Sequence, residues 1–410
     1  MRTSKRASRW GSAGAICLGV VLLTSACGSG GGSAAKGGSS AGTGTSPAAG
    51  STINIGVLGA YSGATAASAD GARDGVLAWV KSVNDSGGIN GHPIKAFVED
   101  DKGDPAASTQ ALRTLVETDH VVALVGPYAQ GTDATWGSYL QAHNVPVVGG
   151  ASASDVWTTN PMYFGAAPGQ VVKAQSFLLG PKAAGATKNF AMYCTEVGSC
   201  ADVANLTKSY AAKLGVEWGG QLAVSATSAN YAAVCLQAKN SGATAVTSAL
   251  PPATFDRVVA ACHQQGFDPI YAVNSGGLTS TSLKTPSLNG LFAYLASFPV
   301  DSPAAVGYLA AMSKYFPSDD LSGNTGQIGW TAGALFQAAL KNVPASATVT
   351  SADVVDGLNS IKDNDLGGLL PQPITFQKGT PHAPQTCVFT AHLKDQKLVT
   401  DSKPLCAQDS

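Results

Sequence analysis

Short apolar runs alternate with longer stretches of helical periodicity along most of the chain. Residues 53–57 alternate apolar and polar positions as in a strand, and apolar residues then recur at helical spacing over 72–83. The run 121–125 is continuously apolar and rich in valine, which is typical of a strand buried on both faces of a parallel sheet. Further short runs follow at 146–148, 190–193, 222–225, 245–248 and 270–273. This alternation predicts an α/β architecture, with ligands at the carboxyl ends of the strands.

The first 27 residues have a different pattern. A basic group precedes an apolar run over 13–23, and the small residues Thr24, Ser25 and Ala26 lead to Cys27. This order is that of a secretory signal, and small residues ending at a cysteine resemble the lipobox of bacterial lipoproteins. We therefore predict a lipoprotein signal peptide over 1–26 and lipidation of Cys27. An ordinary signal peptide with an incidental cysteine is the alternative.

Residues 28–51 consist almost entirely of Gly, Ser, Ala and Thr. Such a segment cannot bury a core and behaves as a flexible tether, with an r.m.s. reach of about 27 Å. Residues 27–51 comprise the lipidated Cys27 and the tether. They predict that the lipid holds the folded body just outside the cell membrane. No later apolar run approaches the ~18 residues that a bilayer span needs, so the lipid is the only membrane attachment we expect.

Length and charge narrow the classes of function. About 360 residues follow the tether, which is more than one core usually organises, so two lobes are expected. The whole chain has 25 basic and 26 acidic residues. The predicted signal peptide holds four of the basic residues and no acidic one, so the mature protein would have 21 against 26, a net charge of −5. There is no basic patch of the kind that binds nucleic acid.

Six cysteines in the body fall into neighbouring pairs. Secretion and proximity favour the disulfides Cys194–Cys200, Cys235–Cys262 and Cys387–Cys406, although six cysteines allow 15 connectivities. Metal ligation is the competing interpretation, and it is disfavoured because no histidine completes a familiar zinc spacing. We expect no metal and no cofactor.

Three stretches carry a family resemblance. They are Ile55-Gly-Val-Leu-Gly-Ala-Tyr-Ser-Gly63; Gly87-Gly-Ile-Asn-Gly-His-Pro-Ile94, which leads to 99–105; and Val125-Gly-Pro-Tyr-Ala-Gln-Gly-Thr132, which precedes 145–152. In their order and spacing they resemble the leucine/isoleucine/valine-binding family of type I periplasmic binding proteins, the extracytoplasmic receptors of ABC importers. The resemblance covers residues 52 to about 399.

The resemblance implies two doubly wound, three-layer α/β lobes joined by three hinge crossovers, near 164–168, 293–299 and 367–373. Lobe one would be 52–166 plus 297–370, and lobe two 167–296 plus 371–410. It also implies a monomeric receptor for amino acid transport, which closes on a small-molecule ligand and delivers it to the membrane permease of an ABC transporter.

Two strand-to-helix loops are candidates for holding the carboxylate of a ligand. The first leaves the strand at 121–125 and enters a helix expected near Asp133; the second follows 146–148. Backbone N–H groups at helix starts favour anions. By the resemblance, the first loop would bind through backbone groups of Ala129, Gln130 and Gly131, and the second through Ala151 and Ser152. The alternative is that the glycines in both loops only turn the chain.

Other candidate ligand-binding residues lie near the same strand ends. Tyr61, Tyr128 and Trp157 could stack on an apolar or aromatic ligand, and Ser62 follows Tyr61 directly. Trp157 could equally pack under its helix. Leu250 precedes two prolines in a loop that suggests selection by shape.

One departure from the family pattern bears on the ligand. Relatives that bind α-amino acids place an acidic residue where this chain has Ser275, followed by Gly276. An ammonium buried without a carboxylate loses several kcal/mol to desolvation, whereas one hydroxyl hydrogen bond returns about 1 kcal/mol. Glu196 could substitute if it faced the cleft. Otherwise we expect a ligand without a free α-ammonium, such as a carboxylate, an amide or a neutral aromatic molecule.

An enzyme is disfavoured, because the six histidines are scattered and no nucleophile elbow, zinc-protease motif or phosphate-binding loop is present. The acids Asp100, Asp101 and Asp104 fit a strand end and a helix cap. The alternative function is a ligand sensor that signals to a membrane partner without transport.

Overall fold

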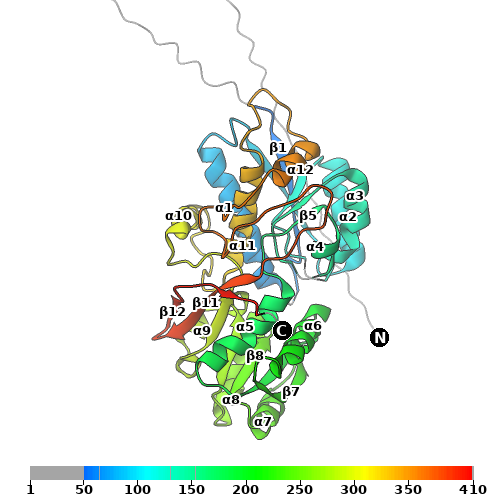
Figure 1. Cartoon of the computed structure of the whole chain (residues 1–410). Coiled ribbons are helices and arrows are strands. Elements are labelled where there is room, and N and C mark those ends of the chain that lie inside the picture. The colour runs from blue at the N-terminus through cyan, green and yellow to red at the C-terminus, as the bar shows by residue number, and fades with distance from the viewer. Residues whose placement is uncertain (1–49, 64, 130, 153, 409–410) are drawn as a thin grey trace, which may run out of the picture. The chain divides into compact units, whose positions relative to one another are not determined.

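A computed structural model describes residues 50–63, 65–129, 131–152 and 154–408 (Figure 1). The predicted signal peptide, Cys27, nearly all of the tether and Gln130 lie outside the described residues. No helix in the described ranges is both long enough and apolar enough to cross a bilayer.

The N-terminal half of the chain forms a parallel five-stranded sheet in the order β2-β1-β3-β4-β5. Six of the seven residues of β1 are buried, as expected for a strand covered on both faces. The strands are β1 (Ile53–Gly59), β2 (Ile94–Asp100), β3 (Ala123–Val125), β4 (Val147–Val148) and β5 (Tyr163–Phe164). The helices that connect them are α1 (Ala66–Asp85), α2 (Pro105–Arg113), α3 (Gly137–His143) and α4 (Val156–Thr159).

A later segment returns to this sheet. Helices α10 (Val306–Tyr315), α11 (Thr325–Ala339) and α12 (Ser351–Asn359) share its core clusters. Helix α11 packs closely on α1, and glycines make that approach possible. A Cβ added to Gly75 would lie 2.0 Å from the Gly326 carbonyl oxygen, and one added to Gly329 would lie 2.0 Å from the Ala72 carbonyl oxygen. We call this sheet with α1–α4 and α10–α12 lobe one.

The second sheet has eight strands in the order β12-β11-β10-β9-β8-β6-β7, with β13 paired to β11. Its strands β6 to β10 are parallel, and β11 and β12 are antiparallel additions. The strands are β6 (Lys188–Cys194), β7 (Glu217–Val224), β8 (Ala245–Ala249), β9 (Ile270–Asn274), β10 (Phe292–Leu295), β11 (Cys387–Lys394), β12 (Lys397–Thr400) and β13 (Leu405–Cys406). The helices are α5 (Gln170–Ala183), α6 (Gly198–Ala211), α7 (Ala232–Asn240), α8 (Pro252–Gln264) and α9 (Ser280–Lys284). We call this assembly lobe two.

The two-lobed α/β fold predicted from the sequence is confirmed. Each lobe is discontinuous, because the chain passes between the two sheets after β5, after β10 and again before β11. Ile374 and Phe376 lie in the core of lobe one, although the sequence analysis gave residues from 371 on to lobe two. Both residues are apolar and buried there, so the chain returns to lobe two later than expected. The remaining lobe boundaries stay a prediction.

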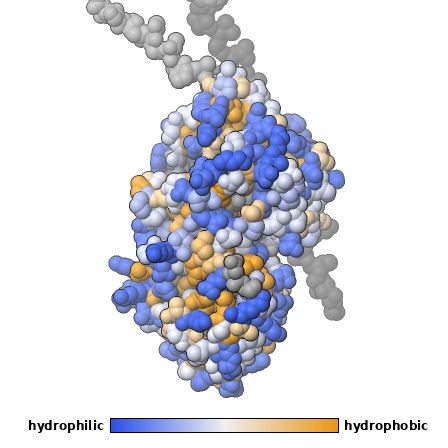
Figure 2. Space-filling model, viewed as in Figure 1, coloured by the Kyte–Doolittle hydropathy of each residue, from blue (hydrophilic) through white to orange (hydrophobic). Residues whose placement is uncertain are grey.

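All three predicted disulfides form: Cys194–Cys200, Cys235–Cys262 and Cys387–Cys406. Each joins elements within lobe two. Apolar residues also reach the surface of this lobe around α5 on the face shown in Figure 2, whereas hydrophilic residues cover more of lobe one in that view.

Candidate functional site

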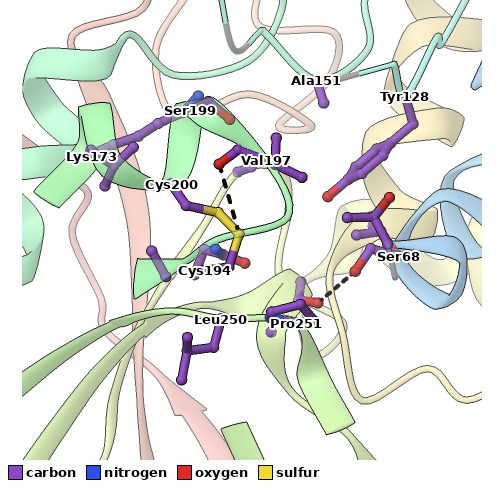
Figure 3. A pocket seen from close by; sticks show the side chains of 18 of the residues that line it. Ser68, Tyr128, Ala151, Lys173, Cys194, Val197, Ser199, Cys200, Leu250 and Pro251 are labelled. Atoms are coloured by element: carbon purple, nitrogen blue, oxygen red, sulfur yellow. Dashed lines mark hydrogen bonds between the residues drawn. A yellow bond between two sulfur atoms is a disulfide. The ribbon is translucent and has the colours of Figure 1, made fainter. Parts of the chain in front are cut away.

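A cavity of about 150 Å³ lies between the two lobes, at the carboxyl ends of their parallel strands. We call it the cleft pocket. Lobe one contributes Thr65, Ser68, Tyr128, Ala151, Ser152, Thr325 and Ile328 to its lining. The other lining residues are Ala167, Gln170, Lys173, Phe177, Cys194, Val197, Ser199, Cys200, Val203, Ala249, Leu250, Pro251, Pro252, Asn274, Gly276, Gly277, Tyr294 and Ala296. Figure 3 shows Tyr128 and Lys173 on opposite sides of this view, with the Cys194–Cys200 disulfide between them.

Five helices begin at the cleft pocket. Lining residues occupy the N-cap or the first turn of α1, α5, α6, α8 and α11, which are 13 to 20 residues long. The first N–H groups of a helix lack intrahelical partners, and the helix dipole adds a partial positive charge at the same end. The convergence of five such ends gives the cavity a positive potential that favours an anion.

Among the described residues that line the cleft pocket, Lys173 is the only charged one. It lies in the first turn of α5, and its Nζ donates to the Ser152 carbonyl oxygen at 2.8 Å. Burial lowers the pKa of Lys173 to about 8, and the charge of Asp133 opposes that shift. The ammonium is therefore mostly protonated at neutral pH. Among the described residues, no aspartate or glutamate lines this cavity to pair with a ligand's ammonium.

The rest of the wall is apolar and aromatic. Phe177 packs edge-on against Tyr294, with ring centroids 5.3 Å apart, and both side chains are buried. Burial raises the pKa of Tyr294, so its hydroxyl stays neutral. Leu250, Pro251 and the Cys194–Cys200 disulfide add apolar surface from lobe two. The cavity therefore combines a cation with apolar walls, which suits an anion on an apolar body.

Contacts bridge the two lobes beside this cavity. The Ser68 hydroxyl of α1 donates to the Gly276 carbonyl oxygen at 3.1 Å (Figure 3). The Ser280 N–H of α9 donates to Asp320, which precedes α11, at 2.9 Å. A ligand bound between the lobes would add further contacts that link lobe one to lobe two.

Of the residues predicted to bind ligand, five line the cleft pocket: Tyr128, Ala151, Ser152, Leu250 and Gly276. Six others do not line it: Tyr61, Ser62, Ala129, Gly131, Trp157 and Glu196. Gln130 lies outside the described residues, and only the backbone of Ser275 is described, at the start of a 3-10 turn. The ligand-binding roles of all these residues stay predictions.

The loop at Ala129–Gly131 differs from its expected form. The helix expected near Asp133 is a 3-10 segment, Asp133–Trp136, and α3 begins only at Gly137. Burial raises the pKa of the Asp133 carboxyl, while Trp157, Ser154 and the backbone N–H groups of Ala134 and Gly131 act against that shift by hydrogen bonding. The N–H of Gly131 thus faces a carboxyl of the protein itself.

Trp157 packs in the core of lobe one, as the second interpretation of this residue proposed. Its indole Nε1 donates to Asp133 Oδ2 at 2.7 Å, and its ring meets Tyr163 edge-on at 5.2 Å. The Glu196 carboxylate is already hydrogen-bonded within lobe two, where it accepts from the Ala226 N–H at 2.7 Å. Burial alone would raise the pKa of Glu196. Hydrogen bonds from the Ala226 N–H and from neighbouring groups outweigh burial, so the pKa is lowered overall.

Tyr61 is partly buried, and its backbone N–H donates to Asp100 at 2.9 Å. Its hydroxyl has no partner among the described residues, and burial raises its pKa. Its ring lies under the Arg73 guanidinium, 5.2 Å from the centroid. These contacts belong to lobe one and not to the cleft pocket.

Sequence reasoning missed Lys173, Phe177 and Tyr294. A signal for Lys173 was present, because it is the only charged residue between Gln170 and Pro181 in an otherwise apolar helix start. Nothing in the local sequence indicates that Phe177 and Tyr294 meet, since 117 positions separate them.

Comparison with known proteins places the chain in a family. A family model described as periplasmic binding protein matches residues 52–397. Comparison with the curated proteins finds no match. Solved structures with the same fold include an extracellular ligand-binding receptor from Verminephrobacter eiseniae, with a TM-score of 0.74 and 21% identity over 85% of this chain and 99% of that one.

Two further structures have titles that name a ligand class. A fatty acid ABC transporter substrate-binding protein from Thermomonospora curvata has a TM-score of 0.71 and 16% identity, over 87% of this chain and 93% of that one. An ABC transporter solute-binding protein from R. palustris in complex with benzoate has a TM-score of 0.72 and 15% identity, over 87% and 97%. At such identities the likeness concerns the fold. The match of the family model over most of the chain confirms the resemblance drawn from the sequence, and the chain belongs to the periplasmic binding protein family.

Proposed function

We propose that this protein is the extracytoplasmic receptor of an ABC importer and that it binds a small carboxylate with an apolar, aromatic body. In this proposal the lobes close on the ligand about the three crossovers, and the closed form presents a new outer surface to the membrane permease. Lipidated Cys27 and the tether over 28–51 keep the receptor at the membrane. The protein acts as a monomer and catalyses no reaction.

The observation that carries the ligand class is the charge of the cleft pocket. Lys173 and five helix starts supply positive potential, and none of the described lining residues is acidic. A free α-ammonium would enter this cavity without a carboxylate partner, at a desolvation cost of several kcal/mol. A carboxylate without an ammonium would accept a charge-assisted hydrogen bond from Lys173.

The size of the cavity narrows the apolar body. A volume of about 150 Å³ lies below the ~300 Å³ at which pockets for drug-sized ligands begin. Phe177, Tyr294 and Tyr128 line it with aromatic rings, which stack well on another ring. A single-ring carboxylate fits these features better than a long acyl chain. The benzoate named for the R. palustris protein and the fatty acid named for the T. curvata protein are both carboxylates without an ammonium.

A titration series against the full-length chain tests this function. The panel is benzoate, phenylacetate, octanoate, leucine and glucose, with dissociation constants from calorimetry and compaction from small-angle scattering. We expect benzoate or phenylacetate to bind most tightly and to compact the protein. Leucine as the tightest ligand would overturn the ligand class, and a saturated protein as extended as the free one would overturn the receptor mechanism.

A sensor without a transport partner is the alternative function, and it makes the same use of the cleft. The import and sensing functions differ only in the membrane partner of the receptor. Uptake of labelled benzoate that requires this receptor supports import, whereas unchanged uptake in cells that lack the receptor supports sensing.

A further inference from the structure

A second and larger cavity, of about 410 Å³, adjoins the cleft pocket. We call it the side pocket. Three segments line it: 152–158 of lobe one, 165–172 after β5, and 382–386 before β11, with Ala407 beside them. The two cavities share Ser152, Ala167 and Gln170. Gln170 and Lys173 both donate to the Ser152 carbonyl oxygen, at 3.2 and 2.8 Å, so these hydrogen bonds lie where the two linings meet.

Gln385 lines the side pocket, and its side-chain amide lies unpaired and almost completely buried behind the wall. The residue is 3% exposed, and neither Oε1 nor Nε2 of its side chain has a hydrogen-bond partner among the described residues. Its backbone is fixed, because its carbonyl oxygen accepts from the Gly169 N–H at 2.8 Å. A buried amide without partners destabilises the protein, so a complementary ligand group would recover that loss on binding.

His382 provides a second unpaired group in the same wall. It is 6% exposed, and its ring lies against Phe164 and Phe376, with centroids 4.4 and 4.8 Å away. Burial lowers the pKa of His382 to about 4, opposed by the Pro161 carbonyl, so the ring is neutral at physiological pH. With one ring N–H directed at that carbonyl, the unpartnered Nε2 is an acceptor.

The rest of the side pocket is mainly apolar, with Trp157, Val172 and Pro384 among its walls. Within the described part of the chain, the one acidic or basic side chain in its lining is that of Asp155, which is exposed. No cation lines it within the described residues, and the start of α5 is the group there that favours an anion. A volume of about 410 Å³ is within the ~300–1,000 Å³ range of small-molecule sites.

We propose that the side pocket is a second ligand site, which takes a neutral molecule made of an apolar ring and a primary carboxamide. Gln385 Oε1 and Nε2 and His382 Nε2 are almost completely buried, so a ligand would reach them only after both side chains turn toward the cavity. Gln385 Nε2 would then donate to the carboxamide carbonyl, and Gln385 Oε1 and His382 Nε2 would accept from its two N–H donors. The ring would lie against Trp157 and Val172. The two pockets would then select ligands of the same shape by their charge.

The test uses benzamide as the probe and benzoate as its isosteric control, on the full-length chain, with the variants Gln385→Met and Gln377→Met. Gln377 is exposed and lies outside both linings, so it is the matched control. We expect benzamide to bind wild type and Gln377→Met equally and Gln385→Met at least tenfold more weakly. Thermal melts show whether each variant is folded.

A second measurement keeps the proposal testable if Gln385→Met fails to fold. In wild type, benzamide should shift the NMR signals of the His382 ring, which lines the side pocket. Absence of both binding and shift, or equal binding to Gln385→Met, would overturn the proposal, and water would then be the only occupant. Displacement of benzoate by benzamide would assign benzamide to the cleft pocket and also overturn it. The benzamide result stands whether or not benzoate binds.

Discussion

The cleft pocket and the side pocket share three lining residues, yet they offer different charged groups to a ligand. The cleft pocket has the ammonium of Lys173 and five helix starts. The side pocket has a neutral imidazole, an unpaired amide and the negative charge of Asp155 at its wall. Hydrogen bonds to one carbonyl oxygen, that of Ser152, lie where their linings meet.

Charge as well as size therefore distinguishes two neighbouring cavities that share part of their walls. Desolvation of a carboxylate is expensive unless a cation or several donors replace the lost water. Among the described residues, only the cleft pocket combines a cation with several helix starts. A carboxamide loses less on desolvation, so two neutral partners suffice for it in the side pocket.

The largest effects are expected from the disulfides that flank the two cavities. Cys194–Cys200 lines the cleft pocket, whereas Cys387–Cys406 lies next to Thr386 and Ala407 of the side pocket. In the loop-entropy model, replacing both cysteines of a pair by alanine should cost about 2 kcal/mol of unfolding free energy for the first pair and about 3 kcal/mol for the second. Chemical denaturation measures both.

Each disulfide variant is the control for the other in binding. The Cys194→Ala, Cys200→Ala protein should lose more affinity for benzoate than for benzamide, because the loosened wall belongs to the cleft pocket. The Cys387→Ala, Cys406→Ala protein should show the reverse order. Equal losses for both ligands in both proteins would mean that the two cavities are not independent sites.

Replacing Lys173 should separate the two pockets most directly. Lys173→Met removes a charged hydrogen bond of about 1.5–3 kcal/mol, so benzoate should bind about 10- to 100-fold more weakly while benzamide binds unchanged. Lys182→Met, on the same helix, is the control, because Lys182 donates to the Leu214 carbonyl oxygen away from the cavity. Calorimetry that finds benzoate affinity unaltered in Lys173→Met would remove the electrostatic basis of the cleft site.

The pH dependence of binding should also differ between benzoate and benzamide. The pKa of Lys173 is lowered by burial to about 8, so above that pH the free protein loses the proton that an anion needs. The affinity for benzoate should fall by about tenfold per pH unit above 8, until the pKa of the complex is reached. Because burial lowers the pKa of His382 to about 4, benzamide affinity should stay flat from pH 6 to 9. Titrations across pH 6–10 check both curves, and parallel curves would contradict the assignment.

Local patterns predicted much of the fold. The valine-rich runs became buried strands such as β3 and β4, and the neighbouring cysteines formed the expected disulfides. Period and composition are local properties, and parallel strands with helices between them have few stable arrangements. The 3-10 segment at Asp133–Trp136 was not predicted, because tertiary burial of its carboxyl, and not propensity, sets its form.

The candidate site was only partly accessible from sequence. Ala151 and Ser152 were found because loops after parallel strands lie at the ligand edge of any such sheet. Lys173 was missed, because a single lysine in an apolar helix start does not reveal which cavity its ammonium enters. His382 and Gln385 were missed for a similar reason, since their significance depends on the absence of partners after folding.

The sequence by itself determined the alternation of strands and helices, the pairs of cysteines and the lack of an acidic residue at position 275. These are properties of neighbouring residues, so they can be read without coordinates. The tertiary structure alone decided that five helix starts and Lys173 surround one cavity, and that an amide and an imidazole are left unpaired in the next. The reason is that potential and hydrogen-bond satisfaction depend on distances between segments far apart in the chain.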